Sequence, residues 1–492
     1  MSRKPNILIF MTDHQRRETL PGFGWARMPR MEEFAQEAVT FTDAVCPSPH
    51  CCPSRASFFS GLYPSDHGVW NNVDVGNALS RGLAKGIRLW SEDLAESGYQ
   101  MYYSGKWHVS AEEGPQDRGF ELLYHTKSYT GIKSGDEMRV PVTYEWNWYT
   151  DRPMCDPAHE RRDGEIMRNG YPEYFLYGEN EHPFGDEDVV NAAVKKLRDG
   201  SDGENPWCMF VGPLGPHDPY FVPQRFLDMY DIDEIELPAN YRDNLLDKPA
   251  LYRRTQKPYS QLTDREQKEA LRHYLAFCTY EDYLFGQVMD ALREGGDYEN
   301  TAVIYLSDHG DYAGAHGLWA KGLPCFREAY AIPLMIKLPG GRRGVRVDDP
   351  VALTDLAPTI LDMADLHPER RFAGVSLKGY LTDGPRPEKR KYRFTQTNGN
   401  ELYGIQRSIF SDEWKYVYNG FDFDELYDLK NDPGELCNLA EDPRYAEVIR
   451  ELSTELWKFA YENHDVNINP YIMVGLAPYG PGVYINKSGE KR

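Results

Sequence analysis

The sequence predicts an α/β fold in which a large mixed, mostly parallel sheet is sandwiched between helices. Four short apolar runs have the length and the continuous hydrophobicity of strands that are buried on both faces. Segments with helical periodicity separate them, and such alternation along a chain is typical of a parallel sheet. The four expected strands are residues 6–11, 99–103, 207–211 and 301–306.

Four segments between these runs carry the helical pattern. The longest opens with Thr263 and has Glu266 three positions later, which is the pattern of a capping box. These side chains satisfy backbone groups that the first helical turn leaves without a partner, so the helix is expected to begin there. The expected helices are residues 31–37, 89–97, 186–197 and about 263–292.

A change in composition at residues 382–391, which are rich in Pro and charge, predicts a linker after a catalytic α/β domain of residues 1–382. Residues 392–492 are expected to form a small C-terminal α+β domain. Its expected elements are antiparallel strands at 392–397, 402–410, 414–418 and 425–429, a helix at 443–461 and an apolar tail at 468–485. Such a tail needs a surface to cover, either on its own chain or on a second subunit, which leaves a homo-oligomer open.

Composition and charge exclude several classes of function. The 492 residues are enough for a large domain with a smaller one. The net charge of −22 argues against nucleic acid and against an anionic membrane surface. No apolar run has the length of a membrane span, and residues 1–11 lack the apolar segment of a secretion signal, so we expect a cytoplasmic protein. Eight cysteines are too few for a disulfide scaffold.

Polar side chains follow each of the expected strands of the first domain. In open parallel sheets, ligands bind outside the carboxyl ends of the strands, so these side chains are expected to meet at one edge. A single histidine after a strand is more often a hydrogen-bonded surface or core residue than a catalyst, but six groups of catalytic type repeat the placement. They are Asp13, Lys106, His108, His217, Asp308 and His309.

Two of these residues are carboxylates of the kind that bind a hard divalent cation, and a histidine follows each of them. The resulting candidate metal ligands are Asp13, His14, Asp308 and His309. A site of this kind that acts on an anionic group also needs cations that hold the anion and groups that move protons. Lys106 and Lys321 suit the first task, and the remaining histidines suit the second near neutral pH.

The segment 51–61 has a cysteine, a spacer and then Pro-Ser-Arg before a short apolar helix that ends at Gly61. Pro53 is tolerated in a first helical turn, which places Cys51 at the helix start. Backbone N–H groups and the helix dipole favour an anion at that point. Arg55 is expected one turn further on, where it can hydrogen-bond the side chain at position 51.

A structural interpretation of the same segment is a zinc knot or a set of buried thiols formed by Cys46, His50, Cys51 and Cys52. Adjacent cysteines do not have the spacing of zinc ligands, and no second ligand pair follows nearby, so zinc is disfavoured. A reactive unmodified thiol would need a histidine partner and a lowered pKa. His50 is too near in sequence to be assumed to be that partner.

The segment as it stands resembles the signature of the sulfatase family, whose fold is alkaline-phosphatase-like. Further matches follow in order along nearly the whole chain, and several ordered matches are more specific than any one. They are residues 6–13, 28–46, 105–108, 216–219, 307–310, 316–322, 355–359 and 426–433.

The resemblance implies a sulfuric ester hydrolase in which a formylglycine-generating enzyme oxidises Cys51 to formylglycine (3-oxoalanine). The hydrated aldehyde attacks sulfur, and the protein releases an alcohol and inorganic sulfate. A divalent metal is implied at the nucleophile, with Cys51 among its ligands. The implied roles of the other residues are sulfate binding by Lys106 and Lys321, general acid for His217 and general base for His108.

One residue departs from the family pattern, since the position after the first metal aspartate is commonly Asp or Gln and here is His14. If both His14 and His309 ligate, the nitrogen donors favour Mn²⁺ or Zn²⁺ over Ca²⁺ or Mg²⁺. If His14 only orients a ligand, Ca²⁺ is the better expectation, and we place Ca²⁺ first.

Two alternatives stay open at this point. A phosphodiesterase or phosphonate monoester hydrolase resembles sulfatases and shares their fold. A catalytically inactive binding protein is a second class, against which the full set of polar residues argues. Long aromatic-rich loops at 114–185 and 219–262 are expected at the rim of the site, where they select the alcohol. A small sulfated substrate, with a sulfated sugar as one candidate, fits the expected location.

Overall fold

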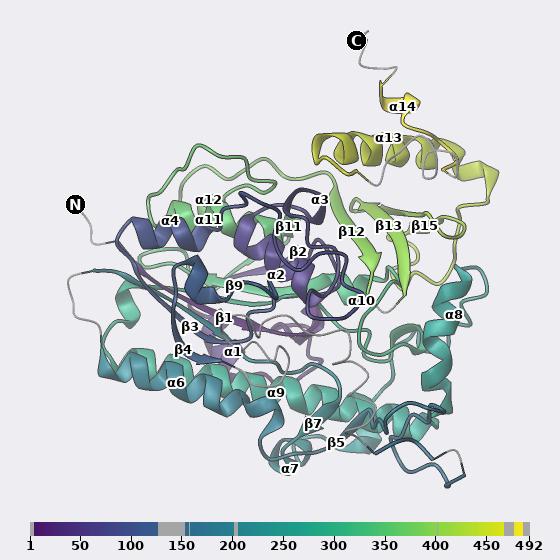
Figure 1. Cartoon of the computed structure of the whole chain (residues 1–492), viewed down its shortest axis with the longest axis horizontal. Helices are drawn as coiled ribbons and strands as arrows, with labels where there is room; N and C mark the ends of the chain where they lie inside the picture. The colour runs from purple at the N-terminus through teal and green to yellow at the C-terminus, as the bar shows by residue number, and fades with distance from the viewer. Residues whose placement is uncertain are drawn as a thin grey trace.

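The centre of the computed structural model is a nine-stranded sheet (Figure 1). The structure describes residues 4–125, 153–156, 158–200, 205–400, 402–466 and 477–485. The strand order is β10 (Val345–Val347), β2 (Val39–Val45), β9 (Ala331–Lys337), β8 (Thr301–Ser307), β1 (Asn6–Thr12), β6 (Trp207–Gly212), β3 (Gln100–Gly105) and β4 (Glu121–His125), with β11 (Val351–Ala352) paired to β2. Neighbouring strands are parallel except at β9, which is antiparallel to β8 and β2. The mixed, mostly parallel sheet predicted from the sequence is confirmed.

The four expected strands are β1, β3, β6 and β8, and each ends one or two residues later than expected. They are adjacent in the sheet, with Leu8 of β1 in register with Met209 on one side and Val303 on the other. All residues of β1 are buried because side chains alternate between two hydrophobic clusters on opposite faces of the sheet. Ile9 belongs to one cluster and Phe10 to the other.

Helices cover both faces, as Figure 1 shows, with α6 and α9 on one side and α2, α4 and α11 on the other. Their bounds are α2 (Cys51–Ser60), α4 (Trp90–Glu96), α6 (Asp186–Asp199), α9 (Asp264–Glu294) and α11 (Leu356–Met363). The expected first helix is α1 (Pro29–Ala35), which packs on α9. The predicted capping box is present: Thr263 Oγ1 accepts from the Glu266 backbone N–H (3.3 Å), and Glu266 accepts from that of Thr263 (2.9 Å).

The expected small antiparallel sheet is present beyond residue 392. Its strands are β12 (Arg393–Gly399), β13 (Tyr403–Phe410), β14 (Trp414–Asn419) and β15 (Glu425–Asp428). Helix α13 (Ala446–Glu462) covers one face, and its Leu452 and Leu456 share a hydrophobic cluster with Tyr416 of β14. In Figure 1 this unit lies to one side of the large sheet.

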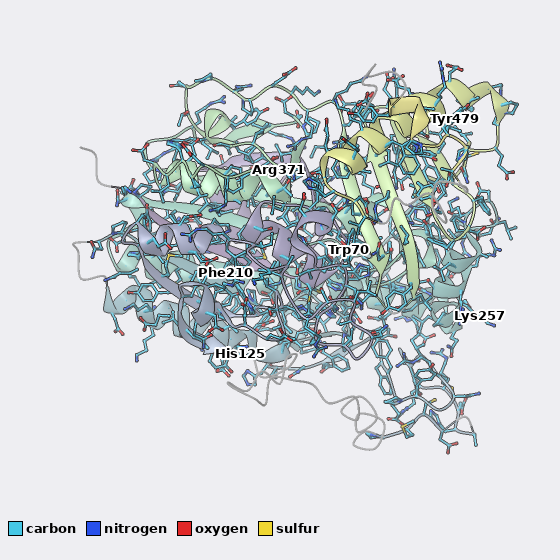
Figure 2. The ribbon with its side chains drawn as sticks, turned by 45° about the horizontal axis from the view of Figure 1, so that its top comes forward. Trp70, His125, Phe210, Lys257, Arg371 and Tyr479 are labelled. Atoms are coloured by element: carbon cyan, nitrogen blue, oxygen red, sulfur yellow. The ribbon has the colours of Figure 1, made fainter. Side chains whose placement is uncertain are left out.

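Buried polar contacts join the C-terminal sheet to the rest of the chain. Lys415 of β14 donates to the backbone oxygen of Cys325 and lies 2.7 Å from Glu435. Arg407 of β13 lies over the ring of Trp70, at 4.9 Å from the ring centroid, and Figure 2 shows Trp70 beside this sheet. At residues 382–392 the chain therefore passes from the large sheet to the small antiparallel sheet, and the two parts pack against each other.

Much of the predicted apolar tail, from 468 to 476, lies outside the described residues. In the described part, α14 (Gly482–Ile485) packs on α13 of its own chain. Trp457 of α13 donates to the backbone oxygen of Tyr479, whose position near α13 is labelled in Figure 2. The contact covers at least this part of the tail without a second subunit.

The two long loops predicted as irregular contain short elements. A two-stranded parallel sheet of β5 (Tyr177–Glu179) and β7 (Tyr220–Val222) joins one loop to the other. The second loop also contains α7 (Gln224–Leu227) and α8 (Ala250–Gln256). Residues 126–152 of the first loop, with its Tyr-Trp stretch at 144–149, lie outside the described residues.

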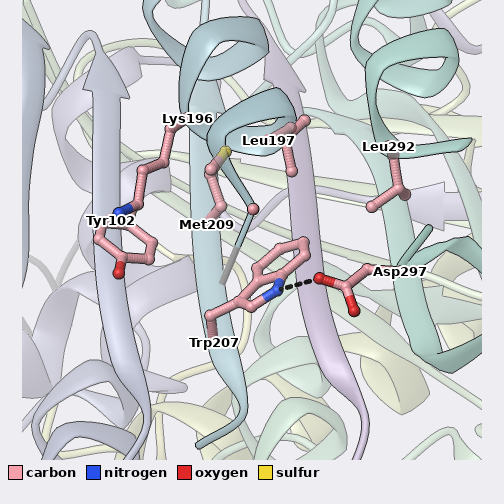
Figure 3. A pocket seen from close by; sticks show the side chains of 8 residues that line it. Tyr102, Lys196, Leu197, Trp207, Met209, Leu292 and Asp297 are labelled. Carbon is pink, nitrogen blue, oxygen red and sulfur yellow. Dashed lines mark hydrogen bonds between the residues drawn. The ribbon is translucent and has the colours of Figure 1, made fainter. Parts of the chain in front are cut away.

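The amino-terminal edge of the sheet offers little space for a ligand. Figure 3 shows a pocket there, between Tyr102 of β3 and Trp207 at the start of β6, where Trp207 Nε1 donates to Asp297 (3.1 Å). Its volume of about 10 Å³ holds no more than one water molecule. Among the described residues, none of the helices combines the length and the apolarity needed to cross a bilayer.

Candidate active site

The carboxyl ends of four neighbouring parallel strands and the start of one helix meet at the opposite edge of the sheet. Each contributes a polar side chain that is at least nine-tenths buried. These residues are Asp13 after β1, Lys106 after β3, His217 after β6, Asp308 after β8 and Cys51 at the start of α2. The convergence expected from strand ends is therefore present.

Cys51 lies at the centre of this group. Its Sγ is 3.6 Å from Asp13 Oδ1 and 3.3 Å from His309 Nε2. It is the first residue of α2, and Pro53 lies within the first turn, as the sequence predicts. The side chain at position 51 therefore projects from a helix N-terminus into a cluster of carboxylate and imidazole groups.

Four residues supply a donor set that fits a divalent cation. The donor atoms of Asp13, Cys51, Asp308 and His309 all lie within 4.8 Å of one another. The backbone oxygen of Gly310 bonds His309 Nδ1 (2.9 Å), so Nε2 of the same ring is directed toward the carboxylates. Two carboxylates with one imidazole suit a hard or borderline cation, and an oxygen at position 51 would complete an oxygen-rich site.

Two cations bond the same carboxylates. Arg55 donates from Nε to Asp308 Oδ2 (2.8 Å) and from Nη2 to Asp13 Oδ2 (3.2 Å), and Lys106 Nζ bonds Asp13 Oδ2 as well. Burial by itself raises the pKa of Asp13, but Lys106 and Arg55 together hold it well below its usual range. Asp13 is therefore ionised and ready to bind a cation near neutral pH.

The predicted contact of Arg55 with the nucleophile takes a different form. Its third hydrogen bond goes from Nη1 to the backbone oxygen of Lys106 (2.9 Å), so the guanidinium is engaged by two carboxylates and a carbonyl. One helical turn does place Arg55 beside Cys51, but the carboxylates are the stronger acceptors. Its position orients the carboxylates of Asp13 and Asp308.

His14 belongs to a neighbouring cluster. Its Nδ1 lies 2.9 Å from Asp311 Oδ2, and its Nε2 bonds Lys321 Nζ. Its donor atom groups with those of Asp13, Cys51 and His217, whereas Asp308 and His309 fall in the other set. The structure thus places His14 beside the metal ligands with one nitrogen held by Asp311, and burial lowers its pKa well below the usual value.

His217 and Lys321 are in direct contact in the site, with Nε2 and Nζ 3.1 Å apart. Burial, and then the charge of Lys321, lowers the pKa of His217 well below its usual value. A sulfate or phosphate group bound at Lys321 would offset the lysine charge and restore basicity to the imidazole.

His108 has the opposite environment. Its Nε2 lies 3.0 Å from Asp74 Oδ1, and although burial lowers its pKa, Asp74 raises it above the ordinary value. The two histidines that the sequence assigned to proton transfer therefore differ in basicity, and His108 is the more basic of the two.

Two residues that orient the site were missed at the level of sequence. Asp74 lies in an irregular segment with no strand before it, so no pattern marks it. Asp311 lies three residues after Asp308 in a stretch of polar residues that could have marked it, and it also accepts from Tyr220 Oη (2.8 Å). Cys46 and His50 of the rejected zinc interpretation belong to neither of the donor sets around Asp13.

Comparison with known proteins gives a family. The profile described as Sulfatase matches residues 5–366, and one described as N-sulphoglucosamine sulphohydrolase, C-terminal, matches residues 314–462. A choline-sulfatase of Rhizobium meliloti is 29% identical over 468 residues, which cover 90% of this chain and 83% of that protein. The uncharacterized sulfatase YidJ of Escherichia coli is 28% identical over 460 residues, which cover 91% and 85%.

Solved structures share the fold. A phosphonate monoester hydrolase of Agrobacterium radiobacter has a TM-score of 0.74 at 21% identity and covers 93% of this chain and 96% of its own. A 2-O GAG sulfatase has a TM-score of 0.72 at 21% identity and covers 98% of both chains. The Sulfatase profile spans the sheet, helix α2 and the segments that carry Asp13 and Asp308, so this chain belongs to the sulfatase family and is a sulfuric ester hydrolase.

Proposed function

We propose that the protein hydrolyses a sulfate ester through a formylglycine derived from Cys51. The observation that carries this proposal is the position of Cys51 Sγ, 3.6 Å from Asp13 and 3.3 Å from His309, in a ring of basic side chains. A cysteine at this helix start would be the target of a formylglycine-generating enzyme. The oxidised and hydrated side chain would supply the oxygen nucleophile.

Asp13, Asp308 and His309, with the oxygen at position 51, would hold one divalent cation, for which we propose Ca²⁺ because carboxylate oxygens predominate. When bound, such an ion polarises a sulfuryl oxygen and lowers the pKa of the attacking hydroxyl. His14 would orient the site from outside the coordination sphere, since Asp311 holds its Nδ1.

The remaining side chains divide the charge and proton transfers. Lys106 and Lys321 would bind the sulfuryl oxygens and hold the ester in line with residue 51. His217, whose pKa would rise when a sulfate oxyanion offsets Lys321, would protonate the leaving oxygen. His108, made more basic by Asp74, would take a proton from the oxygen at residue 51 so that sulfate can leave.

We propose a small sulfated substrate, with a sulfated sugar first, because a 2-O GAG sulfatase shares the fold over 98% of the chain. The similarity to a choline-sulfatase supports a small ester that is not a sugar as the alternative substrate. The second candidate function is cleavage of a phosphonate monoester or phosphodiester, which the fold similarity to a phosphonate monoester hydrolase supports.

Side-by-side assays distinguish the two functions. Protein from its own host is analysed by mass spectrometry for formylglycine at residue 51 and is then assayed with an aryl sulfate and with an aryl phosphodiester. We expect the sulfate to have the higher kcat/KM, by about 100-fold or more, because the site offers a single metal and two lysines to one oxyanion. A higher kcat/KM for the phosphodiester would overturn the primary assignment.

Two variants and one treatment locate the chemistry. Cys51→Ala is expected to lower kcat by about 10³-fold or more, whereas the neighbouring Cys52→Ser should stay within about threefold of the parent protein. Chelation should abolish turnover and release about one ion per chain, with Ca²⁺ restoring more activity than Zn²⁺. Full activity in Cys51→Ala would exclude residue 51 as the nucleophile.

A further inference from the structure

Two buried carboxyl groups lie together behind the turn of residues 214–217, which carries His217. Asp186 is the first residue of α6, Glu281 lies in the middle of α9, and neither side chain is exposed. Both carboxyls lie against Gly215, whose N–H donates to Asp186 Oδ2 (2.9 Å) and whose added Cβ would lie 2.1 Å from Glu281 Oε1. Neither residue enters the reaction described above. Burying two acidic groups next to each other is energetically costly, so their presence calls for an explanation.

Asp186 uses both oxygens to hold the turn. Its Oδ1 accepts from the Leu214 backbone N–H (2.7 Å), and its Oδ2 accepts from that of Gly215 (2.9 Å). The backbone of this turn also forms hydrogen bonds with two residues of the active site. The Leu214 backbone oxygen accepts from the His217 N–H (3.1 Å), and that of Gly215 accepts from the Asp13 N–H (3.1 Å).

Glu281 cannot be ionised in this setting. In the described part of the chain, no N–H or O–H group donates to either of its oxygens, and the carboxyl of Asp186 interacts with it. Two ionised carboxylates in one buried site repel each other, so one of the two keeps a proton. Asp186 accepts two backbone hydrogen bonds, which favour its ionised form, so the proton lies on Glu281 and is donated to Asp186.

The groups that interact electrostatically with the pair include Asp13, Tyr280, Tyr305 and Cys278, and none of these is positively charged. Burial raises the pKa of Asp186 to about 7 in spite of its two N–H donors, and burial next to Asp186 raises that of Glu281 well above its usual value.

The pair also fits closely against the turn. A Cβ added to Gly215 would lie 2.1 Å from Glu281 Oε1 and 2.5 Å from the ring of Phe277, so only glycine admits this approach. The contact transmits any movement of Glu281 to the backbone that carries His217.

We propose that Glu281 and Asp186 share one proton and act as positioning residues for His217, the general acid of the proposed hydrolysis on which this inference rests. The protonated pair keeps Asp186 fixed as a double acceptor, and Asp186 fixes the turn. A proton transferred from His217 to the leaving oxygen then starts from a defined geometry.

The shared proton is tested by stability, without any assay of activity. In Glu281→Gln the amide donates to Asp186 at every pH, whereas the parent protein must keep a proton that its unfolded chain releases above about pH 4.3. An acidic group whose pKa is raised on folding contributes less to the stability of the folded protein as pH rises. The Tm of the parent should therefore fall relative to that of the variant, and the difference should grow steadily between about pH 5 and about pH 8. A Tm difference that is independent of pH would overturn the shared proton.

The positioning role is tested by leaving-group dependence. Asp186→Asn removes an acceptor of the turn, so a sulfate ester of a poor leaving group, an alkyl alcohol, should lose about 100-fold in kcat/KM. A 4-nitrophenyl sulfate, which needs little protonation, should lose about threefold. The matched control is Asp282→Asn, which removes the neighbouring buried carboxylate that accepts from Arg30 N (2.9 Å) and Met31 N (2.7 Å).

The control variant should lower both rates equally, since Asp282 contacts α1 and not the turn. Equal losses on the two esters in Asp186→Asn would refute the positioning role. If the parent protein turns over neither ester, the proposed hydrolysis itself fails. The stability series of Glu281→Gln still decides on the shared proton in that case.

Discussion

At the scale of single residues, burial decides which histidines can carry charge. His67, at the end of α3 (Pro64–His67), accepts from the Val69 N–H at Nδ1 (3.1 Å), and its Nε2 meets Ser57 Oγ (2.9 Å). Ser57 lies in α2, so this ring supports the helix that begins at Cys51. A second proton on Nδ1 would break the bond to Val69, and burial lowers the pKa of His67 to about 3.

This residue predicts an acid-sensitive contribution to stability. A histidine whose pKa is depressed by folding contributes stability above its unfolded value of about 6.5 and loses it as pH falls, at about 1.4 kcal/mol per pH unit until the folded value is reached. We expect His67→Gln to be less sensitive to acid than the parent between about pH 6.5 and about pH 4.5, as measured by urea unfolding. The exposed His367→Gln is the control, and an unchanged pH slope in His67→Gln would contradict the assignment.

Contacts among single residues were also the least predictable from sequence. Asp13, Lys106, Asp308 and His309 were expected in the site because strand ends mark them, and they meet there. Asp74 and Glu281 escaped notice because one lies in an irregular loop and the other in the middle of a long amphipathic helix. A polar residue in a helix gives no sign in the sequence of which buried group it faces.

At the scale of elements, α9 carries the clearest local signal. The capping box of Thr263 and Glu266 fixes the start of the helix, whose buried face includes Tyr274 and Phe285 and contributes the Glu281 of the carboxyl pair. Residues 31–37 and 89–97 were also predicted as helices, and their bounds differ from those of the structure by one or two residues. Local hydrogen bonds set these ends, so a short stretch of sequence suffices.

The cap yields a prediction of its own. Thr263→Ala removes the acceptor for the Glu266 N–H and should lower the free energy of unfolding by about 1 kcal/mol, because one N–H of the first turn loses its partner. Urea unfolding measures the loss. Thr263→Ser keeps a hydroxyl and should restore most of it, whereas equal losses in the two variants would show that the methyl group, not the cap, matters.

The antiparallel strand β9 shows the limit at this scale. Its apolar run at 331–337 has the same character as β1 and β8, since all three are buried on both faces. Strand direction leaves no trace in such a run, because hydrophobicity on both faces suits either orientation. Only the pairing with β8 and β2 decides it.

At the scale of the whole molecule, the buried Lys415 joins the C-terminal sheet to the part of the chain before residue 382 through the backbone oxygen of Cys325. Lys415 and Glu435 are 4% and 2% exposed, and the lysine also bonds the backbone of Cys325, close to α10 (Arg327–Tyr330). An ion pair this deep is costly to break, because the remaining partner stays buried and charged. The division at 382–392 is thus expected to be one of architecture, with the two parts unfolding together.

Because Lys415 also bonds the Cys325 backbone on the other side of the division, its replacement should affect the stability of the entire chain. Lys415→Met is expected to lower the free energy of unfolding by about 3–5 kcal/mol, and adding Glu435→Gln should recover much of that loss by removing the unpaired charge. Calorimetry should show one transition in all three proteins. A separate early transition of the C-terminal part would instead mark residues 392–492 as an independently unfolding domain.

The sequence by itself determined the α/β class, the central strands, the long capped helix and the residues at the carboxyl ends of the strands, because each rests on short-range periodicity or on a local motif. The tertiary structure alone decided how those residues pair. It directed Arg55 to the two carboxylates, set His14 against Asp311 and Lys321, made His108 more basic than His217, and placed Glu281 against Asp186 behind the turn. These are long-range contacts whose energies depend on burial and on the charges nearby, and a linear sequence carries neither.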